Sequence, residues 1–486
     1  MTPFGPYTLL RRIATGGTAE IWLARRHGPD GFLRHLAIKR ILPQLEKEPA
    51  FVQLLLDEAR LAAHLHHGHI IPIDDVGTYD GQAYIAMEYL PGTDLGRVMR
   101  AVKHRRRRVV VACADPDRLD ALVASLEKTL DADVVGASDP PEVERCSMEG
   151  PVDLAVVDTD LVGPIRDPML HQLQSEHPEL LRVLLLGPTS GRRAGCFALG
   201  IDPPEPDRVA MFAQRVLAQR VPIELTVQVV RAVAEALEYA HEARDFAARP
   251  LGVVHRDVNP SNVLLSVGGV VKLVDFGISR ATIRARAEGR GNLVGTVNYM
   301  CPEQTSGLDS DARGDLFSLG IVLWELIAGR HPFAGENEFA TMRSIRESEP
   351  PALDTLVPGL PAALVELARR CLAKKPEDRV GSARELLMAL EELVRREGLN
   401  LSPRRLSRWL ETVYSTEELE AFGVAGTGYE IAPTPVPRFA QQPAATSTRS
   451  AAEVFEVDVD LDGLDDDTVE TPPPSPPTPP GRGSRG

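Results

Sequence analysis

The strongest chemical signal in the sequence is a series of polar motifs between residues 255 and 303. The tripeptide His255-Arg256-Asp257 is followed by Asn262, then by Asp275-Phe276-Gly277, and finally by Cys301-Pro302-Glu303. Carboxylate and amide oxygens are the hard ligands that Mg²⁺ prefers. Ordered elements at such suitable spacings are hard to obtain by chance, so this region is a candidate catalytic site.

Three weaker features lie nearer the N-terminus. Gly16 and Gly17 stand between two strand-like runs, where a missing Cβ lets backbone N–H groups approach a phosphate, although a plain hairpin is the commoner meaning of such a pair. Lys39 falls in a third strand and could pair with phosphates, or it could be a solvated strand end. Glu58 lies on a helix-like stretch 19 residues later and could hold the Lys39 ammonium, or it could be an ordinary surface glutamate.

The elements that must position these residues differ along the chain. Residues 7–90 have the pattern of short antiparallel strands with one helix over 51–65, and the last two strands form a hairpin around Asp80-Gly81. After residue 221 the pattern is mostly helical. The sequence therefore predicts a small sheet followed by a larger helical region.

Composition limits the classes of protein to consider. The chain has 486 residues, of which 43% are hydrophobic and 25% charged, so it is neither collagenous nor wholly disordered. Its net charge of −15 has the wrong sign for a protein that coats nucleic acid or acidic lipid. Five scattered cysteines favour a reducing compartment. The N-terminus lacks an export-signal pattern and no apolar run approaches the roughly 20 residues of a membrane span, so we expect a cytoplasmic protein.

Together, the motifs resemble the bacterial branch of the eukaryotic-like Ser/Thr protein kinases over residues 7–100 and 220–395. The resemblance implies an α+β bilobal kinase fold, with an N-lobe over 7–91 and a C-lobe made of 92–108 and 220–396. It also implies transfer of the γ-phosphoryl group of ATP to protein hydroxyls, with Mg²⁺. Such transfer needs an in-line hydroxyl, neutralised phosphate charge and excluded water.

The resemblance assigns a role to each motif. Asp257 is implied to be the base that orients the substrate hydroxyl, and Asn262 and Asp275 to hold two Mg²⁺ ions. Lys39, held by Glu58, is implied to grip the α- and β-phosphates. Arg256 completes the implied catalytic set. The implied nucleotide-binding positions are Ile13, Gly16, Gly17, Ile21, Ala37, Lys39, Met87, Glu88, Leu90, Asp94, Asn262 and Asp275.

Within that set, Met87 would guard the back of the adenine pocket and Asp94 would lie near the ribose. The backbones of Glu88 and Leu90 would bond the purine edge. Two further implied roles are structural: Glu303 pairs with Arg379, and Asp315 braces the catalytic loop.

The segment from Asp275 to Glu303 has three hydroxyl side chains that are candidate phosphosites: Ser279, Thr282 and Thr296. Thr296 matches the position that shapes the floor of the peptide site. Arg256 could hold a phosphate on Thr282 or Ser279, but the segment already carries four arginines, so ordering without phosphorylation is an equal alternative.

Three positions depart from the family pattern. Ala14 and Ala19 replace the outer glycines of the phosphate loop, which costs freedom at positive φ but keeps the N–H donors. Asn259 stands where Ser/Thr kinases usually place a lysine that contacts the γ-phosphate, so turnover could be slowed. Cys301 replaces the usual alanine, a change of little consequence.

About 110 residues, 109–219, interrupt the kinase pattern. Their alternation of buried strands and amphipathic helices predicts a folded, flavodoxin-like α/β insert. It resembles a receiver domain of two-component signalling, with Asp158 at the phosphoacceptor position. Its chemistry looks degenerate: Cys113-Ala114 replace the acidic pair, and the hydroxyl and lysine positions carry Gly187 and Asp202. We expect a module for binding or dimerisation rather than a phospho-switch.

The remaining segments suggest less chemistry. Residues 64–69 contain four histidines and 103–108 are basic, but a metal site and a nucleic-acid or lipid patch are both less expected than a turn and a solvated helix end. A helix with Leu406, Trp409 and Leu410 on one face is expected within an extension over 401–423. The tail, 430–486, is rich in proline and acidic residues and is expected to be disordered; it and the insert could contact partner proteins.

Two functions of different classes therefore stand. The first is an active Ser/Thr protein kinase. The alternative is a nucleotide-binding pseudokinase scaffold, for which Asn259 is the main argument. Phosphotransfer to a small molecule is disfavoured, because Thr296 and the Cys-Pro-Glu segment resemble a peptide-binding floor.

Overall fold

The computed structural model describes residues 1–28, 32–161, 173, 176–177, 182–186, 198–201, 204–245, 247–276 and 296–423. Gly187, Asp202, Ser279, Thr282 and the tail from residue 430 lie outside this part of the chain.

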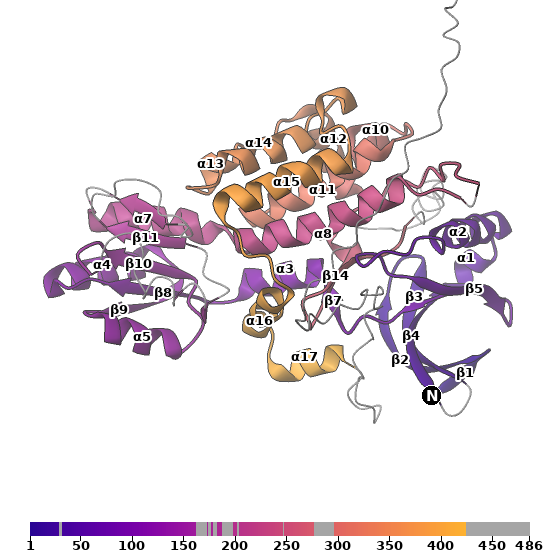
Figure 1. Cartoon of the computed structure of the whole chain (residues 1–486), viewed down its shortest axis with the longest axis horizontal. Helices are drawn as coiled ribbons and strands as arrows, with labels where there is room; N and C mark the ends of the chain where they lie inside the picture. Colours follow the sequence, from indigo (N-terminus) through magenta and orange to yellow (C-terminus); the bar gives the residue numbers. More distant parts are fainter. Residues whose placement is uncertain are drawn as a thin grey trace, which may run out of the picture. The chain divides into compact units, whose positions relative to one another are not determined.

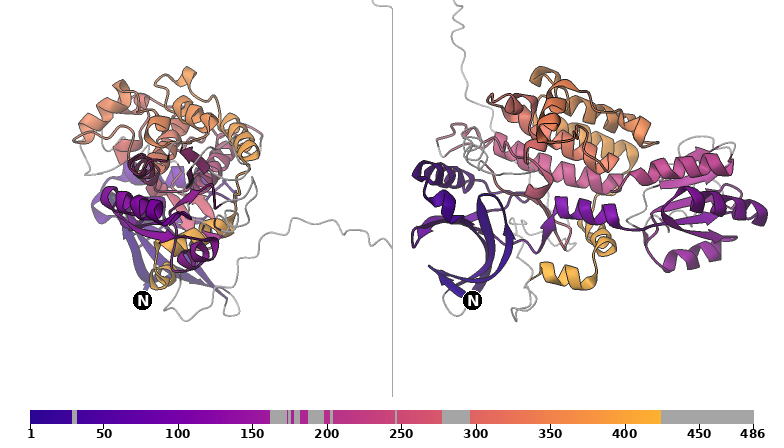
Figure 2. Two further views of the ribbon diagram at one scale, coloured as in Figure 1. Left: turned by 90° about the vertical axis from the view of Figure 1, so that its left-hand side faces the viewer. Right: turned by 180° about the vertical axis from the view of Figure 1, so that it is seen from behind.

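The N-terminal lobe is a six-stranded antiparallel sheet in the order β1-β2-β3-β4-β6-β5. Figure 2 shows it from behind, strongly curved, with α2 beside it. The elements are β1 (Thr2–Phe4), β2 (Tyr7–Thr15), β3 (Ala19–His27), β4 (Leu33–Ile41), α1 (Pro43–Glu46), α2 (Pro49–Ala62), β5 (Ile73–Tyr79) and β6 (Gln82–Glu88). β1 precedes the region expected from the sequence. The predicted hairpin is present: Asp80 and Gly81 both have positive φ, as the tight turn between β5 and β6 requires.

The register of this sheet places Lys39. In β4, Lys39 pairs across the sheet with Ile21 of β3 on one side and with Ile85 of β6 on the other. Two residues earlier, Ala37 pairs with Met87. Since side chains alternate between faces along a strand, Ala37 and Lys39 share one face, and α2 packs against that face through Leu55, Leu56 and Ala59.

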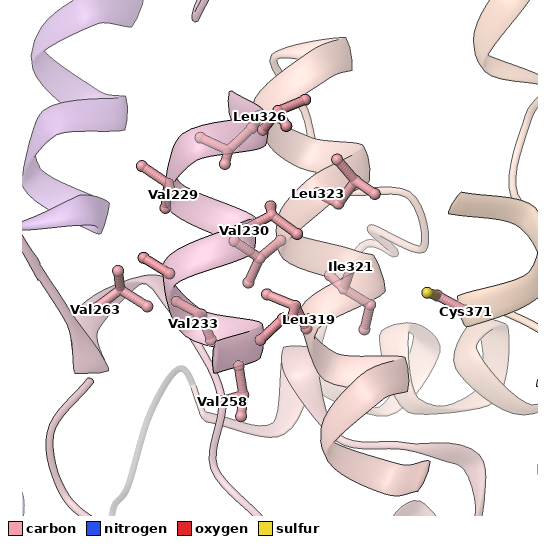
Figure 3. Packing of buried hydrophobic residues seen from close by; sticks show 14 of the residues in the cluster. Val229, Val230, Val233, Val258, Val263, Leu319, Ile321, Leu323, Leu326 and Cys371 are labelled. Carbon is pink, nitrogen blue, oxygen red and sulfur yellow. The ribbon is translucent and has the colours of Figure 1, made fainter. Parts of the chain in front are cut away.

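The C-terminal lobe is helical and its centre is apolar on all sides. Almost every residue of α11 is buried, and α8 lies alongside it; Figure 3 shows Val230 and Val233 of α8 near Leu319 and Leu323 of α11. A helix that is apolar all round must be enclosed by other elements. Those of the lobe are β7 (Gly92–Asp94), α3 (Leu95–His104), α8 (Ile223–His241), η2 (Pro260–Asn262), β13 (Val263–Ser266), β14 (Val271–Leu273), η3 (Thr296–Tyr299), α10 (Pro302–Thr305), α11 (Ala312–Ala328), α12 (Glu338–Glu347), α13 (Leu353–Leu356), α14 (Ala362–Cys371), η4 (Pro376–Asp378) and α15 (Ala383–Glu397).

The insert is a five-stranded parallel sheet in the order β12-β11-β10-β8-β9, with an apolar core on each face. Numbered within the insert, this is the order 2-1-3-4-5 of flavodoxin-like sheets. Figure 1 shows α4, α5 and α7 around it. The elements are β8 (Arg107–Ala112), α4 (Pro116–Thr129), β9 (Ala132–Ala137), α5 (Pro140–Met148), β10 (Leu154–Asp158), β11 (Arg182–Leu186), β12 (Ala198–Ile201) and α7 (Pro206–Ala218).

The two chain crossings into and out of the insert lie side by side. Arg107, only 4% exposed, donates to Asp153 Oδ1 at 2.6 Å and to the carbonyls of Gln219 and Arg220 at 3.5 Å. Arg105 also donates to Asp153, which is fully buried. The two ends of the insert therefore meet at this junction, between the end of α3 and the start of α8. Three residues of the basic run 103–108, Arg105, Arg107 and Arg108, are thus paired at or near this junction, so the run is not displayed as one patch.

The C-terminal extension contributes α16 (Pro403–Val413) and α17 (Thr416–Phe422). The predicted apolar face is confirmed, since Leu406, Trp409 and Leu410 are buried. After α16, the chain reaches the N-terminal lobe, where Tyr89 donates to the Phe422 carbonyl at 2.6 Å. Over the described ranges, no helix has the length and apolar character needed to cross a membrane.

Candidate active site

Asp257 lies in the loop before η2, and its carboxylate is held on both oxygens. Asn259 Nδ2 donates to Oδ1 at 2.9 Å and Asn262 Nδ2 donates to Oδ2 at 3.0 Å. Both amides also donate to the Asp257 carbonyl. An ionised carboxylate has about four acceptor sites, so each oxygen can accept more than the one amide hydrogen bond. The amides orient the carboxylate without neutralising it.

Asp315, on α11, holds the backbone of this loop through hydrogen bonds. It is 1% exposed and accepts from His255 N at 2.8 Å, Arg256 N at 2.7 Å and His241 Nε2 at 2.8 Å. Burial alone would raise the pKa of Asp315, but the hydrogen bond and charge of His241, with His255, outweigh burial and hold the pKa below its ordinary value. The bracing role inferred for Asp315 is therefore present as direct contacts.

These contacts also explain a strained residue. Arg256 has φ 63°, a conformation that costs a residue with a Cβ about 1–3 kcal/mol. Its N–H is held by Asp315, and its carbonyl accepts from Gln304 Nε2 at 2.9 Å. Both backbone groups are thus fixed by side chains from elsewhere, which directs the chain toward Asp257.

Asp275 lies two residues after the end of β14, and the segment before it is bonded to the loop that carries Asp257. Val274 N donates to the Asn262 carbonyl at 2.9 Å, and His255 Nε2 lies 3.0 Å from the Val274 carbonyl. Burial lowers the pKa of His255, so the neutral ring donates through Nε2 and accepts the Asp257 N–H at Nδ1. The segment before Asp275 is therefore bonded directly to the loop that carries Asp257 and Asn262.

Lys39 is joined to this group across the two lobes. Its Nζ lies 2.7 Å from Asp275 Oδ2, and the lysine is 7% exposed, so the carboxylate supplies the counter-charge that a buried ammonium needs. Among the described residues, Asp275 is the one carboxylate that forms an ion pair with Lys39. Glu58, on α2, lies with Arg256 and Phe276 around a neighbouring cavity. In this conformation, then, Lys39 meets Asp275 and the expected pair with Glu58 is not formed.

The residues expected to hold a purine follow β6 toward the C-terminal lobe. Met87 is buried and lines an apolar cavity with Ile73, Ile85 and Phe276. Glu88 accepts from Lys272 Nζ at 2.6 Å, which ties β6 to β14. Asp94 caps α3 by accepting from Arg97 N at 2.9 Å. Leu90 lies between these two on the connecting segment, half-buried.

The glycine turn joins β2 to β3 and is closed by Gly16 N, which donates to the Ala19 carbonyl at 2.8 Å. Neither Gly16 nor Gly17 has positive φ. Neither Ala14 nor Ala19 has positive φ either, so a side chain with a Cβ is compatible with both positions. Ile13 and Ile21 lie in the strands that flank it.

Glu303 and Arg379 form a bidentate pair, with both N–O distances 2.7 Å and the arginine side chain fully buried. Burial alone would raise the pKa of Glu303, but the hydrogen bonds from Arg379 outweigh it and hold the pKa below its usual value. Cys301, also buried, precedes this pair as the N-cap of α10. Of Thr296 the structure describes the backbone, which begins η3.

In the insert, Asp158 ends β10, the third strand of the insert in chain order, and its carboxylate already has partners. Arg118 Nη1 lies 2.9 Å from Asp158 Oδ2, and Cys113 Sγ donates to the same oxygen at 3.4 Å. Asp115 caps α4. The Asp158 carboxylate is therefore already paired with a guanidinium.

The histidines of residues 64–69 anchor the turn after α2. His69 Nε2 lies 3.2 Å from Glu235, and His67 stacks on Tyr239 with ring centroids 5.2 Å apart. Within the described ranges no cluster of three or more His, Cys, Asp or Glu side chains could hold a metal ion by itself. A bound Mg²⁺ would thus need oxygen ligands of other kinds as well. The Asn262 amide oxygen and the phosphate oxygens, together with the Asp275 carboxylate, fit that requirement.

Two contacts of the site could not be inferred from the sequence. In the sequence, Asn259 stood out only because the family usually has a lysine at that position. In the structure, it orients Asp257 and also caps η2 by accepting from Ser261 N at 2.9 Å. Lys272 carried no motif signal, yet it reaches Glu88. An asparagine that precedes Pro-Ser is a common capping signal, and it was the one hint available for the first contact.

Comparison with known proteins finds kinases. The sequence model of the family described as protein tyrosine and serine/threonine kinase matches residues 7–390. The chain is 31% identical over 391 residues to the tyrosine-protein kinase MasK of Myxococcus xanthus, a match that covers 80% of this chain and 43% of that protein. It is 26% identical to the serine/threonine-protein kinase PknE of Mycobacterium tuberculosis, over 80% of this chain and 46% of that protein.

Among solved structures, the PknI kinase domain of Mycobacterium tuberculosis is 23% identical, with a TM-score of 0.45, and the match covers 81% of this chain and 98% of that one. The chain spans less than half the length of the two curated relatives named above. The family match covers both lobes and every motif of the candidate site. The chain therefore belongs to the protein tyrosine and serine/threonine kinase family.

Proposed function

We propose that this chain is an ATP-dependent protein kinase that phosphorylates serine and threonine hydroxyls of other proteins. The observation that carries the proposal is the single bonded network that joins Asp257, Asn262, Asp275 and Lys39. These are the side chains that phosphoryl transfer requires, and they converge from both lobes.

The arrangement supports a division of labour. Asp257, held by two amides, accepts the hydrogen bond of the substrate hydroxyl and keeps its oxygen directed at the phosphorus. Lys39 supplies a buried positive charge toward the phosphates. Mg²⁺, when bound through Asn262 and Asp275, would neutralise the remaining phosphate charge. The oriented carboxylate at Asp257 argues against the scaffold alternative, since Asn259 preserves its geometry.

Serine and threonine are favoured as acceptors by the motif pattern and by relatives such as PknE, whereas MasK is named a tyrosine kinase. The test is incubation of the purified chain with labelled ATP and Mg²⁺, followed by identification of the phosphorylated amino acids. We expect phosphoserine and phosphothreonine. Phosphotyrosine alone would overturn the acceptor assignment, and binding of Mg-ATP without any transfer would favour the scaffold.

We further propose that the insert is a binding module and not a phosphoacceptor. Arg118 and Cys113 already engage Oδ2 of the Asp158 carboxylate, and Asp160 N donates to Oδ1, so attack on phosphorus would compete with these contacts. Treatment with a small phosphodonor such as acetyl phosphate and Mg²⁺ should leave Asp158 essentially unlabelled by mass spectrometry. A stable, stoichiometric acyl-phosphate at Asp158 that the Asp158→Asn variant lacks would contradict the proposal.

A further inference from the structure

A large pocket opens next to the catalytic carboxylate on the side of α3 and α11. Asp257 and Ser261 form one wall, and α3, the segment after the insert and the end of α11 form the others. Lys39 and Asp275 do not line it. The pocket is therefore separate from the charges that serve the nucleotide, yet it reaches the atom expected to orient the substrate hydroxyl.

Four cationic side chains line this pocket: Arg100 and Lys103 on α3, Arg220 before α8, and Arg330 just after α11. They come from three separate segments of the chain, so one helix face does not account for their meeting. In the part of the chain that the structure describes, no carboxylate forms an ion pair with any of the four, although most other arginines near the insert junction are paired. The protein as a whole carries a net charge of −15, so a positive pocket is not its background charge.

The other ionisable groups in the pocket do not cancel this charge. Glu325 is largely buried and accepts from Tyr299 Oη at 2.6 Å, and burial raises its pKa. His331 lies 2.9 Å from the Asn298 carbonyl, and burial lowers its pKa to about 4, so it is neutral near pH 7. The Asp257 carboxylate is already held by Asn259 and Asn262. The pocket thus holds four cationic side chains and two carboxylates, Asp257 and Glu325, and the charge of Lys103 partly offsets the effect of burial on the pKa of Glu325.

We propose that this pocket binds acidic side chains of the protein substrate, so that the chain phosphorylates hydroxyls in segments rich in aspartate and glutamate. The inference rests on the proposed kinase function and adds its substrate class. Opposite charges across such an interface steer association and exclude partners of the wrong sign, because placing like charges together is unfavourable. The proximity to Asp257 favours a peptide that presents a hydroxyl over any other polyanion.

The test compares two peptides that differ only in charge. The first copies residues 461–470 of this chain as a separate synthetic peptide, in which Thr468 follows Asp465, Asp466 and Asp467. The second has lysine at every acidic position. For the wild type we expect kcat/KM to be roughly 10- to 100-fold higher for the acidic peptide, and the preference to weaken as salt is added.

The matched variants reverse charge inside and outside the pocket. Arg100→Glu with Lys103→Glu should abolish or invert the preference; both residues are exposed, so α3 should keep its buried face. Arg330→Glu, on another segment, should shift the preference in the same direction. Arg106→Glu makes the same change in an exposed residue of the same basic run that does not line the pocket, and it should leave the preference unchanged.

A binding measurement separates this inference from the kinase proposal. Acidic and basic peptides with alanine in place of the threonine, followed by fluorescence anisotropy, report on the pocket without any transfer. Selective binding of the acidic peptide, lost in the Arg100→Glu/Lys103→Glu variant, supports the pocket even if no peptide is phosphorylated. Equal or stronger binding and phosphorylation of the lysine peptide by the wild type would overturn the inference and leave the kinase function intact.

Discussion

Asp257→Asn is expected to lower the rate of phosphoryl transfer by about 10²- to 10⁴-fold, the usual contribution of a positioned acid or base. An amide has nearly the same shape as the carboxylate but cannot take up the hydroxyl proton, and it places an N–H₂ group against one of the two amides that now donate to Asp257. Nucleotide binding should persist, because Lys39 and Asp275 are untouched. Steady-state transfer from labelled ATP and the affinity for a fluorescent ATP analogue provide the two measurements.

The matched control is Asp354→Asn, which removes an exposed carboxylate from α13 in the same lobe. It should change neither measurement. If Asp257→Asn retained the transfer rate of the wild type while both proteins showed the same thermal unfolding, Asp257 could not be the residue that orients the acceptor.

Arg379→Ala is expected to destabilise the C-terminal lobe by about 3–5 kcal/mol, because it leaves the buried Glu303 charge without its partner. The substitution removes more than the ion pair, because Arg379 also donates to the carbonyls of Ala373 and Lys374, both at 2.9 Å. Urea-induced unfolding followed by the fluorescence of Trp324, buried in the same lobe, measures the loss.

Arg369→Ala is the control for this change. Arg369 and Glu366 form a pair with the same two-bond geometry, but both side chains are exposed, so water replaces the lost partner. The control variant should unfold close to the wild type. Equal losses in the two variants would show that burial does not set the strength of the Glu303–Arg379 pair.

Local chemistry was predictable where a motif carries its own geometry. The Asp80-Gly81 turn was expected because only certain residues tolerate two successive positive φ angles, and the structure has that turn. The apolar face of α16 was expected from helical periodicity, and its tryptophan and leucines are buried. Asp315 and Glu303 were inferred from the resemblance, and the structure shows the contacts of both.

Pairings between distant charges were less predictable. Lys39 and Glu58 were matched because a carboxylate on the inner face of the helix could hold the ammonium and the resemblance implies that pair, yet Lys39 lies against Asp275. Sequence spacing limits which residues can meet, but the orientation of α2 against the sheet decides which of two carboxylates lies within reach. Asn259 illustrates the same limit: its residue type suggested a missing charge, and its position created a support for Asp257.

By itself, the sequence determined the family and predicted the two lobes, the α/β insert and the residues proposed to handle phosphate, because these depend on residue types in a fixed order. Only the tertiary structure decided that Arg107 brings the ends of the insert together, and that Arg100, Arg220 and Arg330 meet beside Asp257. These side chains come from segments up to 230 residues apart in the numbering. Their proximity results from the packing of α3, α8 and α11, which no local pattern encodes.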